Sequence, residues 1–317
     1  MVEDVFKIQE NFDVKIAGAI LKTLAYFDIF DYPLKPSEVR KFCEQKLTED
    51  QFDAAMNAIL SAGIIYKLEE FYCLRNDHSI AQKRKKGNDG ADQLFPKAYE
   101  IGAFLYKFPY VRGIGISGSL SKNFADEKGD IDFFILTKAD RLWVARTLMH
   151  LFKKLTYIFG KQHSYCMNYY LDETAFEIEE KNIYTATEVK TLVPVAGSKT
   201  LTVFFEKNEW TNGWLPNLQN DEEKIADRSS GLKRFIEWLL NNRIGEMMDN
   251  YLYRLTTKRW LRKESKGKKN IKGRIMSLLT SKHFAKSNPD FYQERIIERY
   301  NDKVEALKSQ WPGFFKE

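Results

Sequence analysis

Residues 113–137 read GIGISGSLSKNFADEKGDIDFFILT, and this stretch decides the fold. Apolar residues predict a strand over Val111–Ser117, which ends at Gly118-Ser119, where a helix is expected to begin. After ten intervening residues, Asp130-Ile131-Asp132 opens a second apolar strand over Ile131–Leu136. Strands and helices continue to alternate beyond it, with a helix over 141–157 and a third strand over 164–171. This alternation predicts a sheet with flanking helices, hence an α+β fold.

The same stretch combines two features of phosphate chemistry. Asp130 and Asp132 are two residues apart on a strand, so their carboxylates project from one face. Such a pair repels itself unless a cation joins it, and hard oxygen ligands suit Mg²⁺. Gly118 lets the backbone approach a bulky anion, and the Ser119 hydroxyl with the first helical N–H groups can hold phosphate. A phosphate cradle facing a metal-binding acid pair is the layout for two-metal phosphoryl or nucleotidyl transfer.

With these residues in this order, the stretch resembles the polymerase-β-like nucleotidyltransferase superfamily, and within it the prokaryotic stand-alone branch. The resemblance implies a nucleoside triphosphate donor, two Mg²⁺ ions and transfer of a nucleoside monophosphate to an acceptor hydroxyl. It places the triphosphate at Gly118 and Ser119, and the metals on Asp130 and Asp132. Lys122, three residues after Ser119, is either a further phosphate contact or an exposed helix lysine.

The third carboxylate of that family is the point of departure. It normally stands on a later strand, which corresponds here to 164–172, SYCMNYYLD. The centre of this strand holds Asn168, and Asn168 and Asp172 share one face. Either Asp172 serves as the third catalytic acid from the end of the strand, or Asn168 takes the usual place and the acid is absent. We favour Asp172 at this point, because an amide cannot take a proton as a carboxylate does.

Three regions are expected along the chain: 1–87, 88–220 and 221–317. The first contains three predicted helices and a hairpin and resembles a winged-helix module. Its would-be recognition helix, between Thr48 and Gly63, carries three acids and no Lys or Arg. Phosphates would repel this helix, so we expect a protein contact here rather than DNA binding. Residues 83–92, KRKKGNDGAD, are polar and predict a linker into the nucleotidyltransferase domain.

The third region is predicted to be helical and contains the positive charge of the protein. Formal charges are −1, −1 and +8 for the three regions, which sum to +6. Residues 258–274 hold nine basic residues against one acid, so we expect a basic loop that is either solvated or a site for an anionic acceptor.

No apolar run is long enough for a transmembrane helix, and the pattern of the first residues gives no reason to expect a secretory signal. The three cysteines form no pair motif, so neither disulfides nor zinc are expected, and the sequence predicts a cytoplasmic protein.

The main hypothesis is a Mg²⁺-dependent nucleotidyltransferase. The first alternative is a catalytically impaired nucleotidyltransferase fold that serves as a binding or scaffold protein, and Asn168 favours it. The second alternative is a winged-helix DNA-binding regulator, against which the acidic helix argues.

Overall fold

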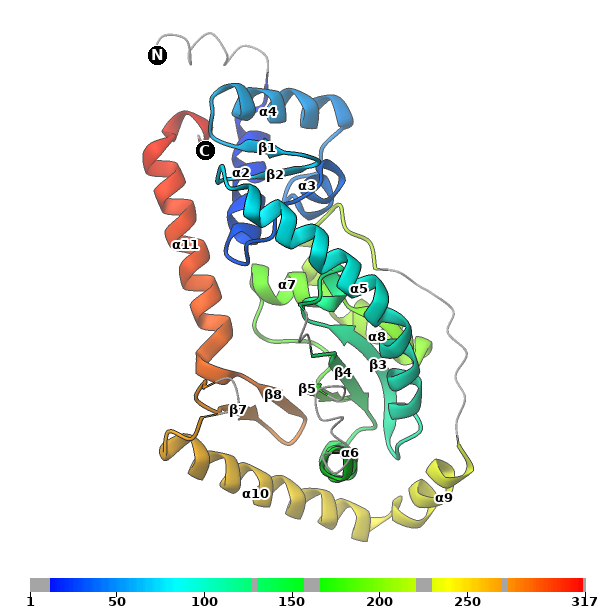
Figure 1. Ribbon diagram of the computed structural model, residues 1–317. Helices are drawn as coiled ribbons and strands as arrows, with labels where there is room; N and C mark the ends of the chain where they lie inside the picture. Colours follow the sequence, from blue (N-terminus) through cyan, green and yellow to red (C-terminus); the bar gives the residue numbers. More distant parts are fainter. Residues whose placement is uncertain (1–11, 127–129, 157–165, 221–229, 270–272, 316–317) are drawn as a thin grey trace.

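The computed structural model describes residues 12–126, 130–156, 166–220, 230–269 and 273–315. A mixed sheet with helices on both faces forms the centre, and a mainly helical module lies at one end of it (Figure 1). The predicted α+β class is confirmed. Among the described residues, no helix has the length and apolar character needed to cross a bilayer.

The central sheet has six strands in the order β6-β3-β4-β5-β8-β7. Only the pair β4 and β5 is parallel, and the other four pairs are antiparallel. The predicted strands are β3, β4 and β5, whereas β6, β7 and β8 were not expected. The strands are β3 (Val111–Ser117), β4 (Asp132–Thr137), β5 (Cys166–Asp172), β6 (Val193–Ala196), β7 (Leu278–Thr280) and β8 (Phe284–Ser287).

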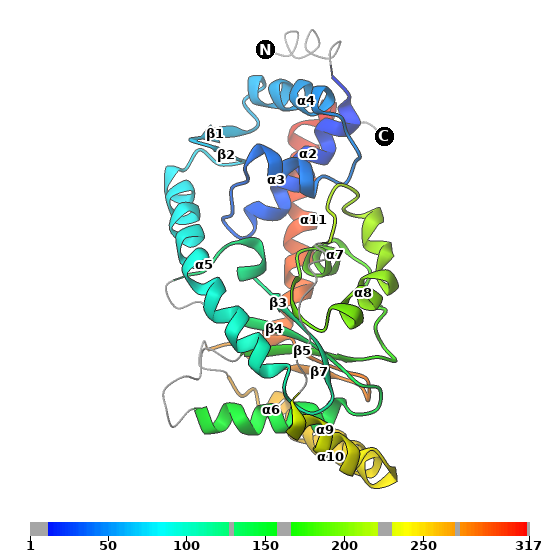
Figure 2. The same ribbon diagram turned by 90° about the vertical axis from the view of Figure 1, so that its right-hand side faces the viewer.

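Helices bury both faces of this sheet. Alternate β4 side chains pack on opposite sides, with Phe133 and Ile135 in one core and Phe134 and Leu136 in the other. Helices α5 and α6 cover the first face, and α7 and α8 cover the second (Figure 2). A strand that is buried on both sides reads as the continuous apolar run seen in the sequence. The helices are α5 (His78–Leu105), α6 (Leu142–Thr156), α7 (Ile183–Lys190) and α8 (Ser198–Lys207).

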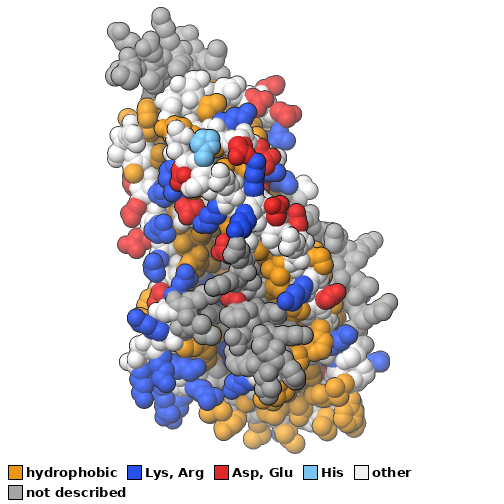
Figure 3. Space-filling model, viewed as in Figure 1, with side chains coloured by type: hydrophobic (Ala, Val, Ile, Leu, Met, Phe, Trp, Pro, Cys, Tyr) orange, Lys and Arg blue, Asp and Glu red, His pale blue; other side chains and the backbone are white. Residues whose placement is uncertain are grey.

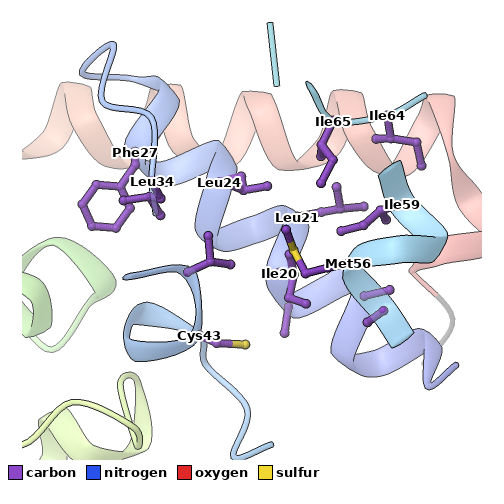
Figure 4. Packing of buried hydrophobic residues seen from close by; sticks show 14 of the residues in the cluster. Ile20, Leu21, Leu24, Phe27, Leu34, Cys43, Met56, Ile59, Ile64 and Ile65 are labelled. Carbon is purple, nitrogen blue, oxygen red and sulfur yellow. The ribbon is translucent and has the colours of Figure 1, made fainter. Parts of the chain in front are cut away.

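The N-terminal module contains three helices and a hairpin in the predicted order. Thr48 caps α4, since its hydroxyl accepts from the backbone N–H of Gln51. The core of the module lies between α2 and α4, with the C-terminal helix α11 behind it (Figure 4). Ile296 of α11 is part of that core, so α11 packs together with the helices of the N-terminal module. The elements are α2 (Val14–Asp28), α3 (Pro36–Phe42), α4 (Glu49–Ser61), β1 (Tyr66–Leu68), β2 (Phe71–Cys73) and α11 (Tyr292–Gln310).

The predicted linker over 83–92 is wrong, because α5 runs unbroken through it from the hairpin to the sheet. Its glycines allow close packing: a Cβ at Gly87 would lie 2.2 Å from the Phe124 ring, and one at Gly90 would lie 2.8 Å from the Ala125 carbonyl oxygen. Arg84, in the same segment, is buried and donates to Glu38 of α3 at 2.6 Å. A polar stretch with the composition of a hinge is therefore part of a packed helix that leads from the module to the sheet domain.

The C-terminal region is not purely helical. Between α10 and α11, the hairpin β7-β8 extends the central sheet by pairing with β5. The basic run over 258–274 is also not one loop, since its first eight residues continue α10 to Ser265. The remaining helices are α9 (Gly231–Leu240) and α10 (Arg243–Ser265).

Candidate functional site

The antiparallel pairing of β3 and β4 brings the two halves of the motif together. Ser117, at the end of β3, is opposite Asp132, at the start of β4. The next residue, Gly118, has a φ of +71°, and a Cβ there would lie 2.6 Å from Oδ2 of Asp132. Only glycine gives this backbone the room for the carboxylate and the left-handed conformation at low cost. The Asp132 carboxylate therefore lies directly against the Gly118 turn.

The helix expected after Gly118 is a single 3₁₀ turn, Leu120–Lys122. It ends at Asn123, which has the left-handed φ of 54°. The expectation of several helical N–H groups for a phosphate is therefore wrong, because so short a turn has few aligned peptide dipoles. Lys122 supplies a cation instead, since its ammonium folds back and donates to the Gly118 carbonyl oxygen at 3.0 Å. Ser119 is exposed at the start of the turn.

A carboxylate that the sequence did not suggest occupies this cradle. Glu188 of α7 accepts from the Lys122 ammonium at 2.7 Å and from the Gly118 backbone N–H at 3.3 Å. The Lys122 side chain is 14% exposed and that of Glu188 is 27% exposed, so water screens the ion pair only in part. The two donors expected to hold a phosphate thus hold a side-chain anion. The one signal for Glu188 in the sequence is that it is the only acid in the helix IYTATEVK.

Asn168 lies beside Asp132. Strand β5 runs parallel to β4, and its register shifts so that Phe133 pairs with Met167 and Phe134 with Tyr169. Asn168 lies at this irregularity, and its Nδ2 donates to Oδ1 of Asp132. Its Oδ1 accepts from the Cys166 thiol at 3.2 Å.

Asp130 and Asp132 lie on either side of the buried Ile131 and are both half-buried. Asp130 precedes β4, which starts at Asp132. Burial, and then the charges of Asp132 and Asp130, raise the pKa of the Cys166 thiol to about 12.

The expectation that Asp172 is the third acid is wrong. Asp172 pairs with Thr137 at the far end of β4, five residues from Asp132 along the strand, or about 16 Å at the usual rise. It is fully buried and accepts from the Asp140 backbone N–H at 3.0 Å. It also faces Nδ1 of His283 at 2.9 Å. These bonds close the loop after β4 and join it to the β7-β8 turn, so Asp172 has a structural role.

Residues from three parts of the chain border the site. Tyr32 of the N-terminal module donates its hydroxyl to the Lys122 carbonyl oxygen. On the other side, the rings of Tyr184 of α7 and Tyr292 of α11 are in contact, with centroids 6.2 Å apart. Burial, and then the charge of Glu188, raise the pKa of both tyrosines, and Asp132 adds to this effect. The site therefore lies where the N-terminal module, the sheet and α11 meet.

The donor set has a limited capacity for metal. Among the described residues, no group of three or more His, Cys, Asp or Glu side chains is placed to hold a metal ion. Two carboxylates and one amide remain, at Asp130, Asp132 and Asn168. Mg²⁺ is commonly held by one or two carboxylates together with water and substrate phosphates, so this set fits Mg²⁺ bound with a nucleotide better than Mg²⁺ alone.

Comparison with known proteins leaves the family open. No protein family, curated protein or solved structure matches the chain. The resemblance to nucleotidyltransferases therefore rests on the residues between Gly113 and Thr137 and on their geometry.

Proposed function

We propose that the protein is a Mg²⁺-dependent nucleotidyltransferase that uses a nucleoside triphosphate as donor and an unidentified acceptor hydroxyl. One observation carries the proposal: the Asp132 carboxylate lies against the Gly118 turn, so close that a Cβ could not fit between them. A left-handed turn that only glycine can form without strain, set against an acid pair, suits a phosphate that must contact backbone and metal together.

The residues take the following roles in this proposal. Asp130 and Asp132 hold Mg²⁺, which when bound neutralises charge on the phosphates and stabilises the charge that develops in the transition state. The Gly118 N–H and the Lys122 ammonium take the phosphate oxygens in place of Glu188. Ser119, exposed beside them, is a further donor. Asn168 can offer its amide oxygen once Asp132 turns to a cation, because rotating the amide exchanges its donor and acceptor ends.

The acceptor side is bordered by a cation. The Arg274 guanidinium, at the end of the basic run, lies 5.6 Å from the ring centre of Tyr292. Through Tyr292, Arg274 adjoins the proposed site, and its charge favours an acceptor that carries negative charge. The Asn168 amide cannot accept a proton, so the acceptor hydroxyl loses its proton to water, and transfer is slow.

A second candidate function is nucleotide binding without transfer. The amide of Asn168 bonded to Asp132, together with the remote position of Asp172, favours it. Under this alternative the protein acts as a binding or scaffold protein. A DNA-binding regulator is a weaker candidate, because Glu49 and Asp50 begin α4 and would face phosphates.

Label transfer tests the proposal. The protein is incubated with each α-labelled nucleoside triphosphate, Mg²⁺ and a cell extract, beside the variant Asp130→Asn with Asp132→Asn. The control exchanges the same groups at exposed positions of α4, Asp50→Asn with Asp53→Asn. Transfer that is lost only in the first variant supports the enzyme. Mg²⁺-dependent triphosphate binding without transfer favours the binding protein, and absence of such binding refutes both.

A further inference from the structure

The outer faces of α9 and α10 expose large apolar side chains in a continuous series. Trp238 is 76% exposed, Met247 70% and Leu232 69%, which is unusual for side chains of this size. On both helices the exposed residues recur at helical spacing, so each helix turns one apolar face to solvent. The members of this apolar face are Leu232, Phe235, Trp238, Leu239, Ile244, Met247, Tyr251 and Leu255.

Polar bonds on the inner side hold α9 in this orientation. Lys233 is buried, and its ammonium donates to the carbonyl oxygens of Tyr106 at 2.8 Å and Val111 at 2.6 Å. Glu237 accepts two bonds from the Arg112 guanidinium, at 2.9 and 2.8 Å. A surface helix normally buries its apolar side and exposes its charges. Here the charged side of α9 binds the rest of the protein, so the apolar side faces solvent.

The second half of α10 turns the same surface from apolar to basic. Arg254, Lys258 and Arg262 follow at intervals of four and are exposed. They line an open depression of about 400 Å³ together with Leu261 and two polar neighbours. No carboxylate in the described part of the chain pairs with these three cations. Figure 3 shows the result at the lower end of the molecule, where an apolar area adjoins a cluster of Lys and Arg.

We propose that this end of the protein, the apolar face together with the three cations of α10, binds the surface of a membrane that contains anionic phospholipid. Exposed Trp, Phe, Leu and Met side chains insert at the boundary of headgroups and acyl chains, and neighbouring Lys and Arg contact the headgroup phosphates. Charge complementarity selects this occupant. A second copy of the chain would cover the apolar face but would bring a second set of unpaired cations to the contact, whereas an anionic bilayer satisfies both halves.

The test is co-sedimentation of the full chain with vesicles of phosphatidylcholine alone and with about one-third phosphatidylglycerol. Binding is expected with the anionic vesicles and should weaken as salt rises. Phe235→Ala with Trp238→Ala should reduce partitioning at least tenfold. Arg254→Gln, Lys258→Gln and Arg262→Gln together should reduce it about a hundredfold, at about fivefold per cation near the surface.

Matched controls remove similar groups elsewhere. Val203→Ala deletes an exposed apolar side chain on α8, and Lys46→Gln, Lys199→Gln and Lys207→Gln remove three exposed lysines. Both controls should bind vesicles as the wild type does. Equal losses in controls and test variants, or no binding of the wild type to anionic vesicles, would overturn the proposal. The proposal would also be overturned if light scattering showed a wild-type dimer that does not bind vesicles and that dissociates in the variant with Phe235→Ala and Trp238→Ala.

A second measurement does not depend on deleting the apolar face. Trp238→Phe keeps an aromatic side chain, so it should still bind vesicles. Lipids that carry a nitroxide on the acyl chain should quench wild-type tryptophan fluorescence and quench this variant less. Equal quenching of the two proteins would show that Trp238 does not enter the bilayer and would refute the assigned surface.

Discussion

Replacing Glu188 with glutamine is expected to lower the unfolding free energy of the ligand-free protein and to raise its affinity for a triphosphate. In the free protein the Glu188 carboxylate holds the Lys122 ammonium at 2.7 Å and the Gly118 N–H at 3.3 Å. A triphosphate must displace that carboxylate before it can use the same donors. The variant keeps the shape of the side chain and removes its charge, so it changes the competition and leaves the packing of α7 intact.

The magnitude follows from the contact. Hydrogen bonds to charged groups contribute about 1.5–3 kcal/mol net when they are shielded from water, and both side chains here are mostly buried. The glutamine amide retains part of this, so the free protein should lose roughly 1–2 kcal/mol of unfolding free energy. The same amount no longer opposes the ligand, which corresponds to about five- to thirtyfold tighter binding.

The assay is calorimetric titration with Mg²⁺ and a nucleoside triphosphate, and separately with inorganic tripolyphosphate, which carries no base. Urea unfolding of the free protein gives the stability. Glu206→Gln, at an exposed position of α8, is the control and should change neither quantity. Lower stability with unchanged triphosphate affinity would show that Glu188 does not stand in the phosphate position. A loss of Mg²⁺-dependent binding would also refute the proposed competition between Glu188 and the phosphate, because it would show that Glu188 acts as a metal-binding acid.

Three other substitutions probe the site and its support. Asn168→Asp places a third carboxylate beside Asp132, so thermal unfolding in the presence of a chelator should show an unfolding free energy that is lower by about 1–3 kcal/mol. Mg²⁺ with triphosphate should reverse this loss, and a loss that persists with both ligands would contradict the reasoning. Gly118→Ala forces a Cβ against Asp132 at a φ of +71°, so we expect a loss of about 1–3 kcal/mol in urea unfolding and of triphosphate binding, and full binding would refute the cradle. Burial raises the pKa of Asp249 from 3.8 to about 6, although the carboxylate accepts from the Val144 N–H. The stabilisation that protonation of Asp249 provides is complete below the unfolded pKa of 3.8 and is lost as the pH rises through 6, so wild type should lose up to about 3 kcal/mol relative to Asp249→Asn between pH 4 and pH 7. Parallel unfolding curves at the two pH values would contradict that shift.

The strands of the motif were predictable because they are buried on both faces. A run such as Phe133–Leu136 has no alternation and can only be a central strand or a buried helix segment, and the acids before it exclude a long helix. The adjacency of Gly118 and Asp132 then follows from the antiparallel pairing of the two strands. The strands of the motif depend on short stretches of sequence, so the local hydrophobic pattern was enough to predict them.

Asp172 was mispredicted because period-two spacing gives the face of a residue but not its register. Strict alternation would put Asn168 and Asp172 on one face, but the parallel pairing puts Asp172 beside Thr137 and leaves Asn168 beside Asp132. Register depends on how the sheet assembles, and a bulge at Asn168 shifts it further. The prediction of a linker over 83–92 was wrong for a related reason. An exposed helix face and a hinge have the same polar composition, and only the packing of Gly87 on Phe124 distinguishes the two.

Glu188 could not be found from the motif, since it reaches the site from 66 residues beyond Lys122. Its position also shows what displacement by a ligand would involve. The end of α7 is tied down, because Lys190 donates to the side-chain oxygen of Asn212 at 2.7 Å and to the Leu218 carbonyl oxygen at 2.8 Å. The Lys122 backbone is held separately by Tyr32. A phosphate that replaces the carboxylate therefore needs a rotation of one side chain and no movement of the helix or the turn. The cost of opening the cradle is then limited to the two bonds of Glu188, and for this reason a single substitution can measure it.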